Sequence, residues 1–233
     1  MARRMSGPLL TSDRAVALLG GARASAGLLD AVLALCGPVA AADGGAAHAL
    51  RRGIAPDIVI GDMDSLAPED AARIPDDRIH RIAEQESTDF DKALRSIAAP
   101  LVIGAGFSGA RADHLLGAYA VLVRRADRRC ILAGEDEVCF LAPPGIALDL
   151  TPGGWFSLFP FGAVTGRSEG LLWPIEGLSF APDGQTGTSN EVTGPVRLWV
   201  DAPRMLVILP RSELSAAVQG LTAAPDGWPA LPG

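Results

Sequence analysis

Residues 56–65 of the chain read PDIVIGDMDS, a short apolar run followed at once by a glycine and two aspartates. The run at residues 57–60 has the length and the branched apolar side chains of a buried β-strand. Asp62 and Asp64 follow it directly. A strand that ends in glycine and carboxylates is typical of an α/β sheet, because ligands of such sheets bind beyond the carboxyl ends of the strands.

The sequence on both sides of this segment repeats the pattern. Predicted strands occupy residues 15–19, 39–42, 57–60, 78–83, 101–103 and 130–133, and helical stretches lie at 28–35, 46–52, 89–98 and 113–125. Strands that alternate with helices need crossover connections, which predicts a mainly parallel, doubly wound α/β/α domain. From residue 138 onward, short β-rich runs alternate with Gly and Pro turns, which predicts an antiparallel β-sandwich domain. We therefore expect an α/β fold with domains at residues 1–135 and 136–233.

The composition argues against several classes of protein. Of the 233 residues, 48% are hydrophobic and 20% are charged, which excludes global disorder. The net charge of −7 argues against binding to nucleic acid or to an anionic membrane surface. No apolar run approaches the roughly 20 residues of a membrane-spanning helix. Cys36, Cys130 and Cys139 form no CxxC pair, so we expect buried, reduced thiols and a cytoplasmic protein.

Small or acidic residues follow five of the predicted strands. In chain order, the candidates are Gly20, Gly21, Asp43, Asp62, Asp64, Gln85, Asp89, Arg111, Asp113 and His114. The carboxyl ends of parallel strands share one edge, so these residues are expected to line a single crevice. The glycine segments match neither the P-loop nor the dinucleotide-binding fingerprint.

The spacing of the aspartates predicts a metal site. Asp62 and Asp64 are one residue apart, so their side chains would lie on the same side of an extended segment. Carboxylates this close repel one another unless a cation lies between them, and Mg²⁺ prefers oxygen ligands. Asp89 and Asp91 repeat the spacing, although Thr88 and Asp91 also form a helix-cap pattern. We predict Asp62, Asp64 and Asp89 as metal ligands; the alternative for the first pair is an Asx-turn that closes a loop.

The basic residues near these carboxylates have two interpretations each. Lys92 is the only lysine in the chain. It could neutralise a phosphate as a point charge, but we favour a position on the exposed face of a helix. Arg111 suits fork-like recognition of phosphate oxygens, and Asp113 is a candidate helix N-cap. His114 is a candidate base, with a structural hydrogen-bonding role as the alternative.

Six segments, in this order, resemble the motifs of the thiamine pyrophosphokinase family. They are residues 42–46 (ADGGA), 56–65 (PDIVIGDMDS), 87–94 (STDFDKAL), 109–114 (GARADH), 170–173 (GLLW) and 188–191 (TSNE). The resemblance spans residues 15–210. It departs from the family at residues 85–87, where QES replaces a lysine–aspartate element of many bacterial members. It also departs at Ala110, where members often carry glycine.

The resemblance implies transfer of an intact diphosphate from ATP to the hydroxyethyl group of thiamine, giving thiamine diphosphate and AMP with Mg²⁺. It also implies a homodimer that holds thiamine between its subunits. Carried over by residue, Asp62, Asp64 and Asp89 hold magnesium, and Asp43 is a catalytic residue beside them. Gly20, Gly21, Arg111, Asp113 and His114 face the nucleotide. Gln85, Trp173, Ser189 and Asn190 contact thiamine, and the alternative for Trp173 is a place in the core.

Three alternative functions use the same acidic edge. A pyrophosphokinase of the same architecture could act on another hydroxymethyl heterocycle, such as a pterin. A metal-dependent phosphohydrolase would release phosphate from a nucleotide without thiamine. The third alternative is a non-catalytic nucleotide sensor, although a protein that only binds a nucleotide would not need three metal-binding carboxylates. The proton of the attacking hydroxyl would pass to Asp89 or Asp43, and the sequence does not distinguish between them.

Overall fold

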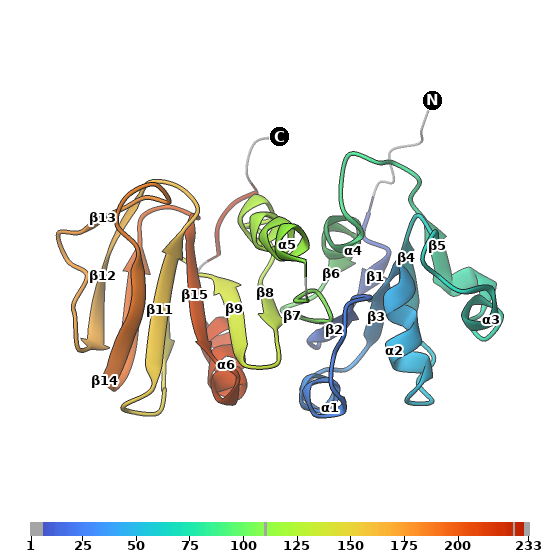
Figure 1. The fold of residues 1–233 in the computed structure, drawn as a ribbon, viewed down its shortest axis with the longest axis horizontal. Helices are drawn as coiled ribbons and strands as arrows, with labels where there is room; N and C mark the ends of the chain where they lie inside the picture. The colour runs from blue at the N-terminus through green and yellow to red at the C-terminus, as the bar shows by residue number, and fades with distance from the viewer. Residues whose placement is uncertain (1–6, 110, 226, 231–233) are drawn as a thin grey trace. The chain divides into compact units, whose positions relative to one another are not determined.

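The computed structural model describes residues 7–109, 111–225 and 227–230 (Figure 1). The chain forms two compact units, Met1–Ala118 and Tyr119–Gly233. The helix α5 (Ala112–Arg124) contains the point at which these units meet in the sequence. The domain boundary near residue 135 stays a prediction. Ala110, the second departure from the family pattern, lies outside the described residues.

The first unit is built on a parallel sheet with the strand order β7-β2-β3-β4-β5. The strands are β2 (Val16–Leu19), β3 (Val39–Ala42), β4 (Ile58–Gly61), β5 (Ile79–Arg81) and β7 (Val102–Ala105). All residues of β2, β3, β4 and β7 are buried. Strands covered on both faces are expected to be continuously apolar, which explains why this sequence has apolar runs here instead of alternation.

Short helices connect these strands (Figure 1). They are α1 (Ala26–Ala34), η1 (Asp43–Gly45), α2 (Ala46–Leu50), α3 (Pro68–Ala71), η2 (Asp76–Arg78) and α4 (Asp89–Ser96), of which η1 and η2 are 3₁₀ helices. The helix predicted at residues 89–98 is two residues shorter, because Ile97 and Ala98 form β6 (Ile97–Ala98). This strand pairs in parallel with β1 (Leu10–Thr11). Pairing with a distant strand thus overrides the local helical pattern.

The strands within the second unit pair in antiparallel fashion, and one isolated parallel bridge joins Phe180 and Gln185. Its elements are β8 (Cys130–Ala133), β9 (Glu137–Leu141), β10 (Gly145–Leu148), β11 (Trp155–Pro160), β12 (Val164–Leu171), β13 (Ser179–Phe180), β14 (Gly187–Val200), β15 (Met205–Pro210), η3 (Arg211–Glu213) and α6 (Leu214–Ala223). Buried and exposed residues alternate along much of β12 and β14. This alternation is typical of strands with one face on a core and one in solvent.

The long strand β14 connects two layers of the sandwich (Figure 1). Residues 187–191 pair with β11, whereas residues 192–200 pair with β12, and β10 joins the same end. One strand therefore belongs to both sheets, which is a common way to form the corner of a sandwich. The fold class expected from the sequence, a parallel α/β domain followed by an antiparallel β-sandwich, is confirmed.

The cysteines behave as the sequence predicts. Cys36, Cys130 and Cys139 are buried and carry free thiols. Burial raises the pKa of the Cys36 thiol to about 12, although the nearby positive charge of Arg14 opposes the shift. Among the described residues, no helix is both long enough and apolar enough to cross a membrane.

One glycine brings the ends of two strands into contact. A Cβ atom added at Gly45 would lie 2.0 Å from the carbonyl oxygen of Leu19, the last residue of β2. Gly45 ends η1, the turn that directly follows β3. Only a residue without a side chain permits this close approach of the two backbones.

We expect Gly45→Ala to lower the free energy of unfolding by at least about 2 kcal/mol, because the new methyl group meets a backbone atom that cannot rotate away. Urea denaturation measures the effect. Gly27→Ala is the matched control: an added Cβ meets nothing within 4 Å at this exposed position in α1. There, alanine should be neutral or stabilise the protein by up to about 1 kcal/mol. Equal effects of the two substitutions would contradict the close approach.

Candidate metal and nucleotide site

The site begins where β3 and β4 end. Asp43 follows β3 directly, and its backbone is in the left-handed region with φ of 45°. A Cβ atom added at Gly61, the last residue of β4, would lie 2.8 Å from the Cβ of Asp43. The two strand ends are therefore packed against one another. A non-glycine residue in the left-handed region is energetically unfavourable, and such residues concentrate at functional sites.

The segment from Asp62 to Asp64 is not extended, so that expectation was wrong. Met63 has φ of 66°, and it packs against the core cluster that contains Val59 and Ile74. The backbone N–H of Asp64 donates to Asp62 Oδ1 at 3.3 Å, which is the Asx-turn considered as the alternative. The turn directs Met63 inward, and it brings the two aspartates together without the alternation of a strand.

Three carboxylates converge at this edge. Asp43, Asp62 and Asp64 each offer an oxygen atom, and these atoms lie within 4.8 Å of one another. Asp43 Oδ2 accepts a hydrogen bond from the backbone N–H of Ser65, whereas the buried Asp43 Oδ1 has no hydrogen-bond partner among the described residues. A buried carboxylate oxygen without a partner is costly unless a cation or a donor reaches it. The donor set, all oxygen and all anionic, therefore fits a hard divalent ion such as Mg²⁺.

Asp43 is the most perturbed of these acids. Burial raises its pKa to about 6; the charges of Asp89, Asp64 and Asp62 act in the same direction, and the Ser65 N–H opposes them. Burial also raises the pKa of Asp62. The backbone N–H of Asp64 and the side chains of Lys92 and Gln85 lower it more, so the pKa of Asp62 lies below its ordinary value.

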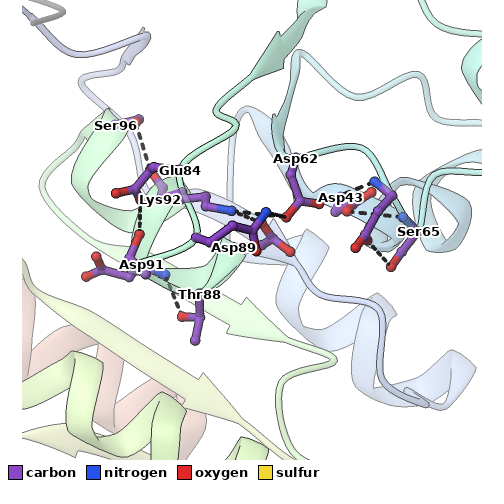
Figure 2. A network of polar contacts seen from close by, with 12 residues as sticks. Asp43, Asp62, Ser65, Glu84, Thr88, Asp89, Asp91, Lys92 and Ser96 are labelled. Atoms are coloured by element: carbon purple, nitrogen blue, oxygen red, sulfur yellow. Dashed lines mark hydrogen bonds and ion pairs between the residues drawn. The ribbon is translucent and has the colours of Figure 1, made fainter. Parts of the chain in front are cut away.

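Asp89 stands at the start of α4, beside this cluster, and is held by a lysine (Figure 2). Lys92 Nζ donates to Asp89 Oδ1 at 2.9 Å and to Asp62 Oδ2 at 3.4 Å. Lys92 is only 1% exposed, so the interpretation that we favoured, an exposed helix residue, was wrong. The role of Asp89 as a metal ligand stays a prediction.

Lys92 and Ser65 are the residues near the carboxylates whose part the sequence did not reveal. The charge partner Asp62 lies 30 positions before Lys92, which local periodicity cannot detect. Two signals were present: Lys92 is the only lysine, and it stands one helical turn after Asp89. Ser65 acts through its backbone N–H, which carries no signal in the residue type.

Helix α4 begins after the N-cap residue that the sequence predicts, Thr88. Thr88 Oγ1 accepts a hydrogen bond from the backbone N–H of Asp91 at 3.2 Å, which confirms the helix-cap pattern. Asp91 itself is buried, and its carboxylate lies 3.9 Å from Arg95.

Gln85 Nε2 donates to Asp62 Oδ2 at 3.3 Å, so this side chain reaches the acidic edge. Its contact with thiamine stays a prediction.

The residues assigned to the nucleotide lie in three places. Gly20 packs closely, because an added Cβ would lie 2.5 Å from the carbonyl oxygen of Gly106. Gly21 is exposed and lies near η1. Arg111, Asp113 and His114 stand at the start of α5, and all three are exposed. Their roles toward ATP stay predictions.

Arg111 and Asp113 are paired with one another. The guanidinium donates through Nε at 3.1 Å and through Nη2 at 2.6 Å to the two carboxylate oxygens. The hydrogen bond and charge of Arg111 lower the pKa of Asp113 to about 2. Because α5 begins at Ala112, Asp113 lies in its first turn, and the prediction that it is the N-cap was wrong. This exposed carboxylate interacts mainly with the Arg111 side chain, and the backbone N–H of His114 also contributes to its lowered pKa.

The second unit holds the other predicted substrate residues. Trp173 is 57% exposed, which excludes the alternative of a place in the core. The buried Asn190 accepts hydrogen bonds at Oδ1 from the N–H groups of Trp173 (3.1 Å) and Glu191 (2.9 Å), and its Nδ2 donates to the carbonyl of Trp173 (2.7 Å). Ser189 has φ of 61°. Asn190 thus fixes the backbone that presents the Trp173 indole, and thiamine contacts by these residues stay predictions.

Comparison with known proteins agrees with the motifs. Residues 30–132 match the family model described as "Thiamin pyrophosphokinase, catalytic domain". The chain is similar to thiamine pyrophosphokinase 3 of Oryza sativa subsp. japonica, with 30% identity over 162 residues, 61% of each chain. It is also similar to thiamine pyrophosphokinase 1 of Arabidopsis thaliana, with 27% identity over 165 residues, 63% of this chain and 62% of the relative. The chain thus matches about three fifths of the length of these relatives.

Solved structures share the fold. Thiamin pyrophosphokinase from Candida albicans has a TM-score of 0.70 at 15% identity, covering 90% of this chain and 94% of that chain. The enzyme from Geobacillus thermodenitrificans has a TM-score of 0.69 at 22% identity, covering 87% and 99%. The resemblance identified from the six motifs is confirmed. The matched range contains the acidic cluster, whereas Trp173, Ser189 and Asn190 lie beyond it.

The raised pKa of Asp43 predicts a pH-dependent stability in the metal-free protein. The folded state holds the Asp43 proton more tightly than the unfolded chain, whose aspartate pKa is about 3.9. Ionisation of Asp43 therefore destabilises the fold as the pH rises from about 4 to 6. With a chelator present, Asp43→Asn should be about 1–3 kcal/mol more stable than the wild type at pH 7 and equal to it near pH 4. A difference in urea denaturation that does not change with pH would contradict this.

We expect Asn190→Ala to lower the free energy of unfolding by about 1–3 kcal/mol, because backbone groups of Trp173 and Glu191 lose their partner. The fluorescence of Trp173 should also change. To separate its signal from that of the other tryptophans, the same substitution is measured in a Trp173→Phe background. Thr188→Ala, at an exposed position of the same strand, is the control and should stay within about 0.5 kcal/mol of the wild type. Unaltered Trp173 fluorescence would show that Asn190 does not hold this residue.

Proposed function

We propose that the chain transfers the diphosphate of ATP to the hydroxyethyl group of thiamine, because residues 30–132 match the family model of the thiamin pyrophosphokinase catalytic domain. The products would be thiamine diphosphate and AMP. The observation that carries the proposal is the convergence of Asp43, Asp62 and Asp64 inside the matched range, with one buried carboxylate oxygen lacking a partner. A site of this kind suits phosphoryl-type transfer, which depends on positioning and on charge stabilisation.

The acidic residues would hold the metal. We assign Mg²⁺ to Asp62, Asp64 and Asp89, with Asp43 beside them. When bound, Mg²⁺ would neutralise the phosphate oxygens of ATP and orient them. The protein supplies fixed carboxylates on rigid strand ends, which maintain their geometry without reorganisation. The proton of the thiamine hydroxyl would pass to Asp43 or Asp89.

The remaining residues would bind the two substrates. Gly20, Gly21, Arg111, Asp113 and His114 would face the nucleotide. Phosphate oxygens would compete with Asp113 for Arg111, because both offer the guanidinium a planar pair of acceptors. Gln85 would bind thiamine from the acidic edge.

The β-sandwich would complete the thiamine site. Trp173, Ser189 and Asn190 would contact thiamine from a partner subunit, so a homodimer is part of the proposal. The exposed indole of Trp173 supports this, because an aromatic face attracts a cationic ring such as the thiazolium. The cytoplasmic location also stays a prediction.

Product identification with the purified protein tests the function. With ATP, Mg²⁺ and thiamine, we expect AMP and thiamine diphosphate to appear in equal amounts. Asp62→Asn should lower kcat/KM by at least about 100-fold, because the metal loses a charged ligand. Asp77→Asn, at an exposed position in η2, is the matched control and should keep normal turnover.

Other products would identify the alternative functions. Formation of ADP or free phosphate without thiamine would indicate a phosphohydrolase and reject the proposal. AMP formed only when a hydroxymethyl pterin replaces thiamine would indicate the related pyrophosphokinase.

A further inference from the structure

The chain has 20 Lys and Arg residues, and its only lysine is buried within the acidic edge. The side chain of Lys92 is 2% exposed, whereas those of its partners Asp62 and Asp89 are 15% and 32% exposed. A buried ammonium group is stable only when anionic partners replace the water that it has lost. Here it has two such partners.

The two partners come from different elements. Asp62 follows β4, and Asp89 opens α4 after the intervening strand β5. Figure 2 shows the Lys92 side chain directed toward both carboxylates. The ammonium thus connects the turn that carries Asp62 to the start of the helix. Helix α4 itself packs on β3 and β4, so the base of the lysine is held by the same core.

The type of cation is also informative. An ammonium group is a compact charge with three donors, whereas guanidinium is planar and wider. In a chain that otherwise uses arginine, the single lysine stands where a cation with a 2% exposed side chain is paired with two carboxylates. Asp43 and Asp64 add further negative charge next to Asp62. The cluster therefore contains an internal positive charge before any metal ion binds.

We propose that Lys92 is a positioning residue: an internal counter-ion that holds Asp62 and Asp89 together in the metal-free protein and so fixes the geometry of the carboxylates. The identity of the ion that these carboxylates receive rests on the proposed function. The counter-ion role does not, because it is defined in the absence of metal, ATP and thiamine.

Substitutions at Lys92 separate charge from packing. In a chelator at pH 7, Lys92→Met keeps the length of the side chain but leaves the carboxylates uncompensated, and its Tm should fall by at least about 5 °C. Lys92→Arg keeps the charge, so its Tm should lie between those of the wild type and Lys92→Met. If Lys92 acted only by filling space, methionine would be tolerated and the larger arginine would be the more damaging substitution.

A double-mutant cycle with Asp89→Asn tests the contact itself. Removal of one negative charge should relieve the defect of Lys92→Met, so the double variant should have a Tm at least about 3 °C above the additive value. Arg95→Met is the control cation on the same helix, because its ion pairs go to Glu84 and Asp91. Its cycle with Asp89→Asn should be additive.

The outcomes are decisive in each case. Additive Tm changes for Lys92→Met and Asp89→Asn, or a Lys92→Met protein as stable as the wild type, would overturn the counter-ion role. If Lys92→Met does not fold, recovery of folded protein in the double variant supports the role, and failure of the double variant contradicts it. Because these measurements use no substrate, they can fail while the diphosphate transfer stands, and the reverse also holds.

Discussion

Repulsion between carboxylates at the ends of neighbouring parallel strands is the constraint on which the rest of this site depends. Asp43, Asp62 and Asp64 approach within 4.8 Å, close enough for like charges to destabilise the fold. Three features oppose the repulsion: backbone N–H groups at Ser65 and Asp64, the ammonium of Lys92, and the raised pKa of Asp43. A divalent ion between the carboxylates would remove the remaining imbalance, which is the reason that we predict a metal site here.

The backbone holds the charges in place. Asp43 and Met63 are in the left-handed region, and Gly45 and Gly61 permit contacts that a side chain would block. Such local costs persist only where the surrounding structure enforces them. Here the continuously buried strands β3 and β4 provide that support, and Met63 anchors the turn in the core. The stability of the sheet thus maintains an arrangement that the acidic turn would not adopt alone.

The sequence predicts the fold well and the site in part. Apolar runs can be recognised from neighbouring residues alone, so the sequence predicts the parallel strands and the antiparallel sandwich. The clustering of Asp62 with Asp43 also follows, because parallel strands end at one edge. The buried Lys92 does not, since its partner Asp62 is remote in sequence. The turn at Met63 was predicted only as an alternative, because the alternation rule holds for extended backbone and a left-handed residue breaks it.

Diffraction at the manganese absorption edge, from crystals grown with Mn²⁺ in place of Mg²⁺, tests the central claim most directly. Manganese takes the same oxygen ligands and gives an anomalous signal that locates the ion without assumptions about the reaction. We expect one strong peak in contact with carboxylate oxygens of Asp62 and Asp64 and within reach of Asp43. Crystals with no peak among these three residues, or with the ion bound only elsewhere on the chain, would contradict a metal site at the strand ends.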